Sequence, residues 1–446
     1  MLKAQKLTLA VLISAAIISS AQASEQSEAK GFVEDANGSI LFRTGYISRD
    51  KKNGVDDTSS FAQTAIVNIE SGFTPGIVGF GVGVVGDGSF KIGANKNAGN
   101  NMIPRETGFN DEGVLTKGAG DSYDHWARGG GSVKARFSNT TVRYGTQVLD
   151  LPVLASNTAR LVPEYFTGTL LTSHEIKDLE VIAGKFTKDQ YSDQVNTDGR
   201  HLDRAIVWGA KYKFDDNLNA SYYGLDSKDK LERHYLNVNY KQPLANDSSL
   251  TYDFSGYHTK FDANARTYSA TGFVAPDYAD NGKAGEEKTN NIWAISAAYN
   301  TGPHNIMVAY QQNSGNVGYD YGENADGGQS IYLPNSYLSD FIGNDEKSAQ
   351  IQYSLDFGKL GVLPGLNWTT AFVYGWDIKV RNVTDDAEER EFFNQVKYTV
   401  QSGFAKDASL RIRNSYYRAS NAYQTNAYIG DTNEWRIFLD IPVKLF

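Results

Sequence analysis

The chain has 446 residues, a formal net charge of −9 and no cysteine. An acidic chain is a poor match for nucleic acid, and the absence of cysteine excludes disulfides and thiolate chemistry. The 27 Tyr, 22 Phe and 43 Gly against only 10 Pro are typical of many strands, interfacial aromatic girdles and tight turns. No Pro/Ser-rich linker or low-complexity segment divides the chain, so a single domain is predicted.

Residues 1–23 have the pattern of a secretory signal peptide. Lys3 and Lys6 form its positive end, residues 7–18 its apolar stretch, and residues 21–23 read Ala-Gln-Ala, a small-residue cleavage pattern. The predicted mature domain is residues 24–446. No later window has the roughly 18 consecutive apolar residues of a spanning helix, which excludes a helical inner-membrane protein, whereas a β-barrel crosses a membrane with short alternating segments.

Strand-like alternation of apolar and polar residues recurs along the mature chain. Such alternation predicts strands because successive side chains of a strand point to opposite faces. The predicted strands are 40–48, 60–69, 78–90, 132–137, 141–148, 179–186, 205–214, 218–225, 235–241, 250–258, 292–300, 306–312, 349–357, 366–378, 391–401, 409–418 and 434–446, with two more near Trp126 and Leu170. Merging the 126 and 132 stretches into one long strand gives about 18 strands, an even number as in bacterial barrels.

The connections between these segments alternate in length. Short polar turns lie at 138–139, 215–217, 246–248, 302–304 and 406–408, and long excursions at 91–125, 149–168, 259–290, 313–347 and 379–390. Short periplasmic turns and long extracellular loops are typical of outer-membrane barrels. The predicted fold is therefore an all-β, transmembrane antiparallel β-barrel in the outer membrane of a Gram-negative cell.

The last two predicted strands indicate which face meets lipid. In Leu410-Arg411-Ile412-Arg413 the two guanidinium groups share one face, and Arg436 shares a face with other charged residues of the final strand. A midplane Lys or Arg that faces lipid costs roughly 2–4 kcal/mol, so these faces should line the lumen. Phe446 falls in phase with the charged face, which predicts a bulge or a frayed end there.

A set of basic residues is predicted to line the path of the solute. On the strands they are Arg43, Arg49, Lys134, Arg136, Arg143, Lys211, Arg411, Arg413 and Arg436. Closure of a barrel pairs the last strand with the first, which should bring Arg43, Arg411, Arg413 and Arg436 to one stretch of wall. Like charges repel unless water or an anionic ligand compensates them, which favours an anionic solute. The alternative is that each cation pairs with a wall carboxylate or binds lipopolysaccharide phosphates from a loop.

The long connection at 149–168 differs from the others because it is apolar. With its flanks it reads QVLDLPVLASNTARLVPEYFTGTLLT. An apolar loop should fold inward and narrow the pore rather than lie in external water, so it is the predicted constriction loop. Asp150, Ser156, Asn157 and Arg160 would then line the constriction. The alternative is an extracellular flap packed on neighbouring loops.

Signals for catalysis or metal binding are weak. The six histidines are scattered without HExxH spacing, and no Gly-x-Ser-x-Gly elbow occurs. In residues 79–84, Gly alternates with Phe or Val, which indicates a strand rather than a dinucleotide fingerprint. We expect no enzyme, cofactor or metal site; turnover that stops when a Ser or His is replaced would identify an outer-membrane hydrolase instead.

Several stretches carry a family resemblance that spans nearly the whole mature chain. They are GFVED at 31–35, LFR at 41–43, GFTPG at 72–76, RYGTQ at 143–147, LPVLASN at 151–157, RLVP at 160–163, GVLPGL at 361–366, QSG at 401–403 and LRIRN at 410–414. Together they resemble the OprD family of substrate-specific outer-membrane porins, also called outer-membrane carboxylate channels.

The resemblance implies a monomeric or weakly trimeric 18-stranded barrel whose third extracellular loop forms an inward eyelet. It also implies a ladder of basic residues that guides carboxylates, compatible here with Arg43, Lys134, Arg136, Arg143, Arg160, Arg411 and Arg413. Two departures predict altered selectivity: Thr158 stands where the loop often carries an acid, and residues 370–373 lack an Arg that many members have.

The predicted function is passive uptake of small anionic or zwitterionic solutes, such as carboxylates and amino acids, by a barrel surrounded by lipid and lipopolysaccharide. The alternative is a weakly selective general or sugar porin, in which tyrosines would form an aromatic slide along the path.

Overall fold

The computed structural model describes residues 24–52, 56–93, 98, 102–109, 115–116, 120–198, 202–262, 288–322, 331–380, 383–424 and 429–446. The predicted signal peptide, residues 1–23, lies outside them. Within the described residues no helix is long and apolar enough to cross a membrane.

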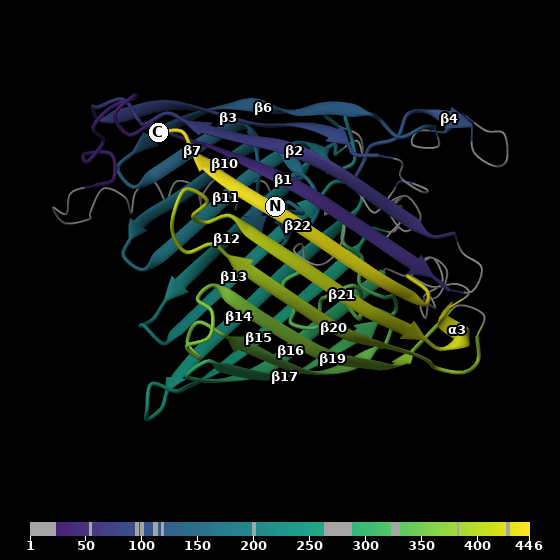
Figure 1. Ribbon diagram of the computed structural model, residues 1–446. Coiled ribbons are helices and arrows are strands. Elements are labelled where there is room, and N and C mark those ends of the chain that lie inside the picture. Colours follow the sequence, from purple (N-terminus) through teal and green to yellow (C-terminus); the bar gives the residue numbers. More distant parts are fainter. Residues whose placement is uncertain are drawn as a thin grey trace.

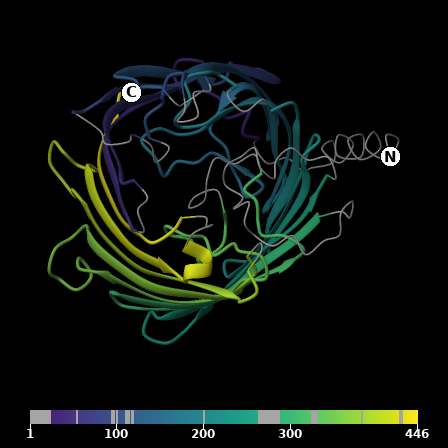
Figure 2. The ribbon, with the colours of Figure 1, turned by 90° about the vertical axis from the view of Figure 1, so that its right-hand side faces the viewer.

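Within that part of the chain, eighteen strands form one closed antiparallel sheet (Figures 1 and 2). They are β1 (Asn37–Lys51), β2 (Thr58–Glu70), β3 (Val78–Lys91), β6 (His125–Phe137), β7 (Thr140–Gln147), β10 (Tyr165–Ile176), β11 (Leu179–Gln190), β12 (Ala205–Lys213), β13 (Leu218–Ser227), β14 (Leu231–Pro243), β15 (Ser249–Phe261), β16 (Lys288–Thr301), β17 (His304–Gly315), β18 (Lys347–Asp356), β19 (Leu366–Ile378), β20 (Ala387–Thr399), β21 (Ser409–Ala419) and β22 (Thr432–Lys444). The predicted all-β barrel is confirmed, and the stretches near Trp126 and Ser132 form the single strand β6.

The remaining elements of the described residues are short and lie in the connections. They are the hairpin of β4 (Gly108–Phe109) and β5 (Leu115–Thr116), the hairpin of β8 (Asp150–Leu151) and β9 (Leu154–Ala155), and the helix α3 (Asn421–Gln424). In Figure 1 the short turns lie at the end of the barrel marked C, and α3 and β4 lie at the other end. Because outer-membrane barrels have short periplasmic turns and long extracellular loops, we assign the α3 end to the cell exterior.

The barrel closes where the two ends of the chain meet. β1 pairs with β22 along thirteen residues, from Ser39 opposite Lys444 to Lys51 opposite Thr432. Alternation then separates the faces: Trp435, Leu439 and Ile441 are exposed on the outside, whereas Glu434, Arg436 and Phe438 are buried inside. Arg43, Arg436 and Asp440, in the membrane-spanning part of the closing strands, therefore face the lumen, as the cost of placing a charge in lipid requires.

The C-terminal residue lies beyond this ladder. β22 ends at Lys444, and the backbone amide of Leu445 donates a hydrogen bond of 2.8 Å to the carbonyl of Gly38. A β-carbon on Gly38 would lie only 2.8 Å from Cζ of Phe446. Gly38 shares the lipid-facing side of β1 with Phe42, so the Phe446 ring covers bare backbone on the outer side although its sequence phase points inward.

Candidate functional site

Residues 149–164, here called the apolar loop, run through the interior of the barrel. Leu149, Leu151, Val153 and Leu154 are buried in a cluster with side chains of β10 to β16 and of residues 317–321 and 331–342. Leu161 and Val162 are buried in another cluster with residues of β1, β2, β6 and β22, which lie on the opposite side of the ring. Figure 2 shows blue and teal chain segments, the colours of this part of the sequence, inside the ring of strands. The apolar loop thus contacts two opposite walls.

Glycine on β1 lets this loop approach the wall closely. A β-carbon on Gly45 would lie 2.7 Å from the ring of Phe438 and 3.2 Å from Cδ1 of Leu161. Any larger residue at position 45 would displace one of these two side chains. The Arg43-Thr44-Gly45 sequence therefore combines a lumen-facing cation with a bare patch that receives the loop.

A buried ion pair holds the C-terminal end of the apolar loop. Arg128 of β6 lies 2.9 Å from Asp87 of β3, and both side chains are fully buried. Arg128 also donates hydrogen bonds of 2.6 Å to the carbonyls of Pro163 and Tyr191, and the Tyr165 hydroxyl donates to Asp87 at 3.0 Å. Because both charges are fully buried, removing Arg128 or Asp87 alone would leave an uncompensated charge in the wall.

The structure places the predicted constriction residues unevenly. Ser156 and Asn157 are buried and serve the loop itself: Ser156 Oγ accepts from the amide of Leu149 at 2.9 Å, and Asn157 Oδ1 from that of Ala159 at 2.8 Å. Asp150 is exposed and accepts from the hydroxyl of Tyr332. The loop also ends earlier than expected, since Tyr165 begins β10 and residues 166–168 pair with 145–147.

Five arginines, here called the basic wall, share the lumen faces of β1, β21 and β22: Arg43, Arg49, Arg411, Arg413 and Arg436. Their spacing follows from strand register, because Arg413 lies directly opposite Arg436 and Arg411 opposite Phe438. The guanidinium carbons of Arg411 and Arg43 lie 5.3 and 5.5 Å from the centre of the Phe438 ring.

Two carboxylates of β22 partly neutralise this wall. Asp440 accepts from Arg43 at 2.7 and 3.0 Å, and Glu434 bridges Arg49, at 2.8 Å, and Arg436, at 3.2 Å. Five arginines against two carboxylates leave an excess of positive charge on these lumen faces.

Arg160 of the apolar loop adds to the positive charge. It is buried, and its carbonyl accepts a hydrogen bond of 3.0 Å from Arg43. Burial, followed by the positive charges of Arg436 and Arg49, lowers the pKa of Arg160 well below its ordinary value. An anion placed beside this wall would therefore be attracted by several arginines at once.

The remaining predicted cations lie apart from the basic wall. Lys134 of β6 and Arg143 of β7 both contact Glu70, each at 2.6 Å. Arg136 contacts Gln26 at 3.2 Å and lies 4.2 Å from the Phe73 ring centre. These three are tied to the wall near its periplasmic end, in part by the carboxylate pairing that the sequence left open as an alternative. Lys211 of β12 lies opposite Glu180 in the ladder, on another part of the ring.

A second inward segment was missed by the sequence analysis. Residues 331–346, here called the polar loop, are mostly buried. Asn313 of β17 donates to the carbonyls of Ile342 and Gly343 at 2.7 and 2.6 Å. Glu391 of β20 accepts from the backbone amides of Leu338 and Ser339 at 3.0 Å.

Arg413 links the polar loop to the basic wall. Its guanidinium donates to the carbonyl of Tyr337 at 3.3 Å and lies 5.0 Å from the centre of the Phe393 ring. Tyr337 in turn stacks on Phe393 at 4.3 Å between ring centres. The sequence did contain a signal: Glu389 and Glu391 alternate with Arg390 and Phe392, so two carboxylates face the lumen and need donors.

These observations describe a closed barrel with two inward loops and an unbalanced basic wall. The family described as "outer membrane porin, OprD family" matches residues 30–445. The chain belongs to the OprD family of outer-membrane porins. It is therefore an outer-membrane channel for small solutes, and its relatives are channels rather than enzymes.

Individual relatives agree with this assignment. The chain is 36% identical to Porin D of Pseudomonas aeruginosa over 455 residues, which covers 96% of this chain and 95% of that protein. The crystal structure of Acinetobacter baumannii OccAB1 is 84% identical, with a TM-score of 0.86, and covers 95% of this chain and 100% of that one. The crystal structure of Pseudomonas aeruginosa OccK2 (OpdF) in complex with glucuronate is 25% identical, with a TM-score of 0.75, and covers 94% of this chain and 99% of that one.

Proposed function

We propose that this porin is selective for small anionic or zwitterionic solutes, carboxylates and amino acids among them. The observation that carries the proposal is the excess of arginine over carboxylate on the lumen faces of β1, β21 and β22. Such a field raises the local concentration of anions in a narrow aqueous path. Arg43 of the basic wall contacts Arg160 of the apolar loop, and in this proposal that loop narrows the path.

The proposed mechanism is passive facilitated diffusion past the apolar loop, residues 149–164. Arginine side chains replace part of the hydration of a carboxylate as it passes. Asp440 and Glu434 orient Arg43, Arg49 and Arg436 and reduce their net charge. Binding at each position is thereby weak enough for release, which conduction requires. No cofactor takes part.

The comparison with OccK2 supports the proposal. That porin was crystallised with glucuronate, a sugar that carries a carboxylate. Glucuronate and glucose have nearly the same size and differ in charge, so the pair separates electrostatic selection from size exclusion. They are the natural probes for this chain.

The test replaces arginines of the basic wall and measures both solutes. In proteoliposome swelling, we expect Arg411→Ala combined with Arg413→Ala to lower glucuronate uptake roughly tenfold relative to glucose uptake, because a charge-assisted hydrogen bond contributes about 1.5–3 kcal/mol. Arg411→Gln removes one positive charge and leaves the hydrogen bond from Arg413 to Tyr337 in place. This single change should retain most of the selective loss of glucuronate uptake.

Lys211→Gln is the matched control, since it removes a cation from another part of the wall and should change the ratio little. An equal loss of both solutes, or no loss of either, would contradict selection by the basic wall. Glucose passing as fast as glucuronate through the unaltered channel would favour a general or sugar porin instead.

The described tyrosines give the sugar alternative little support. Tyr223, Tyr235 and Tyr257 do face inward, side by side on β13, β14 and β15. All three are buried in the cluster that receives the apolar loop, and the Tyr257 hydroxyl donates to the carbonyl of Pro152 at 3.0 Å. They hold the loop rather than form a slide along the water path. The oligomeric state, monomer or weak trimer, stays a prediction.

A further inference from the structure

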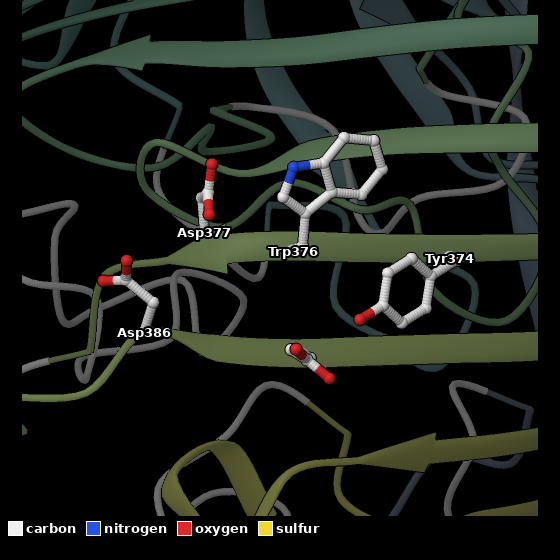
Figure 3. A pocket seen from close by; sticks show the side chains of 5 residues that line it. Tyr374, Trp376, Asp377 and Asp386 are labelled. Atoms are coloured by element: carbon white, nitrogen blue, oxygen red, sulfur yellow. The ribbon is translucent and has the colours of Figure 1, made fainter.

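A groove of about 480 Å³ lies on the outside of the barrel, at the extracellular ends of β19 and β20. Its lining residues are Tyr374, Trp376, Asp377, Asp386 and Glu388 (Figure 3). Tyr374 and Trp376 continue the face of Phe372, which is exposed on the lipid-facing side. The groove therefore begins where the apolar band of the outer surface ends, and the solute path inside the barrel does not reach it.

A local irregularity of β19 shapes this groove. The pairing of β19 with β20 shifts register between Gly375 and Ile378, and Asp377 between them has a φ of +63°. A β-bulge of this kind re-aims side chains and bends the strand, and Asp is among the few residues that tolerate left-handed backbone. Figure 3 shows Trp376 and Asp377 on this bend, with Asp386 beside them where the next strand begins.

Aromatic rings form one side of the groove. Tyr374 and Trp376 are stacked, with ring centres 5.8 Å apart and planes at 18°. The ring centre of Tyr310 on β17 lies 6.3 Å from that of Trp376, which extends the aromatic surface towards β17. Parallel, solvent-accessible rings present flat apolar faces on which the C–H face of a sugar ring can stack.

The charges of the groove are held in place and nearly balanced. Lys347 pairs with Asp377 at 2.7 Å, Lys379 pairs with Asp386, and the Tyr374 hydroxyl hydrogen-bonds Glu388. A balanced set attracts a free ion weakly. Carboxylates fixed in this way still have lone pairs that can accept hydrogen bonds from hydroxyl groups.

We propose that this groove binds the sugars of the glycolipid that forms the outer leaflet, namely the core sugars of lipopolysaccharide. Stacked aromatic rings beside oriented carboxylates suit a neutral, polyhydroxylated ring. The groove opens at the membrane height where the acyl region gives way to sugars. The phosphates of the same glycolipid fit less well, because the lysines are already paired and the three carboxylates outnumber them.

The test compares glycolipids with and without core sugars on the full-length, detergent-solubilised porin, read by native mass spectrometry. The unaltered protein should retain rough lipopolysaccharide in preference to lipid A. Trp376→Ala and Glu388→Gln should each reduce that preference roughly threefold to tenfold. Binding of lipid A and single-channel conductance should stay unchanged, which shows that the barrel is intact.

Tyr252→Ala is the matched control. Tyr252 stacks on Tyr240 at 6.5 Å on the outer face of β14 and β15, towards the periplasmic end, where no lipopolysaccharide sugars occur. This change should leave the preference as it is. Equal loss of lipid A binding in the groove variants would overturn the proposal in favour of acyl or phosphate contact. If EDTA abolished the preference, a bridging cation rather than sugar stacking would account for it, and the proposal would fail. The proposal would also fail if neither variant lost the preference.

Discussion

The two inward loops reach the same interior by opposite means. The apolar loop, residues 149–164, is held mainly by burial of its Leu and Val side chains against two walls. The polar loop, residues 331–346, also buries Ile331, Leu333 and Ile342 in the cluster that contains Leu149. Its backbone, however, is held by directed hydrogen bonds: it accepts from Asn313 and Arg413 and donates to Glu391. Apolar burial is non-directional and depends on fit, whereas a buried hydrogen bond is costly to lose on one side only.

This contrast predicts that each loop fails for a different reason. The apolar loop should respond to lost volume, and the polar loop to lost acceptors and to protonation. Both segments lie beside the basic wall, so loosening either one should alter conduction. Variants that loosen only one loop test whether the two are held independently.

The largest effect is expected from Leu161→Ala. Leu161 is fully buried against Gly45 and Phe438, and truncating such a leucine costs about 2–5 kcal/mol. Amide hydrogen exchange across residues 149–164 should rise more than about tenfold, with larger and noisier single-channel currents. Leu360→Ala, in an exposed turn, should change neither. Unaltered exchange in Leu161→Ala would show that the hydrogen bonds of Arg128 suffice to hold the loop.

A smaller effect is expected from Glu391→Ala. This change leaves the amides of Leu338 and Ser339 without their acceptor, at about 1–3 kcal/mol for a buried donor. Exchange should rise across residues 331–346 and stay constant across 149–164. Glu391→Gln keeps one acceptor oxygen, so its exchange across residues 331–346 should lie between that of the unaltered protein and that of Glu391→Ala. Equal loosening of both loops would show that they form one unit.

The smallest effect is expected from pH. Burial, followed by the nearby carboxyl of Glu389, raises the pKa of Glu346 well above its ordinary value, and Gly343 donates to Glu346 at 2.7 Å. The folded loop therefore favours the protonated acid. Its stabilisation is complete below the ordinary pKa of about 4.5 and is lost as pH rises through the raised pKa. Current noise from the polar loop should grow with pH, and Glu346→Gln should flatten that dependence. A pH response that survives the substitution would place the titration elsewhere.

Much of the barrel and part of the site could be predicted from the sequence. Alternation in residues 410–413 assigns the lumen face, and the cost of charge in lipid makes that assignment firm. The apolar loop could be anticipated because hydrophobic side chains in a long connection must be buried. Its end at Glu164 rather than 168 depends on strand pairing with β7, which local pattern does not contain.

The polar loop could not be anticipated in the same way. Its composition resembles that of an extracellular excursion, and its anchors Asn313 and Glu391 lie on strands 78 positions apart in the chain. Only the closed sheet brings them to the same segment. The contact of Arg413 with Tyr337 was missed for the same reason. Alternation along a strand predicts the face to which a side chain points, but it does not predict which residue the side chain contacts.

Closure by β1 and β22 has a consequence for the order of assembly. Arg43 and Asp440 are separated by 397 positions in the sequence, so their pair forms only after the C-terminal strand has reached the first one. The packing site of Leu161 is likewise incomplete until β22, which carries Phe438, has paired with β1. An open, partly inserted sheet would lack the Arg43–Asp440 pair, and the chain completes the basic wall in the same step that closes the barrel.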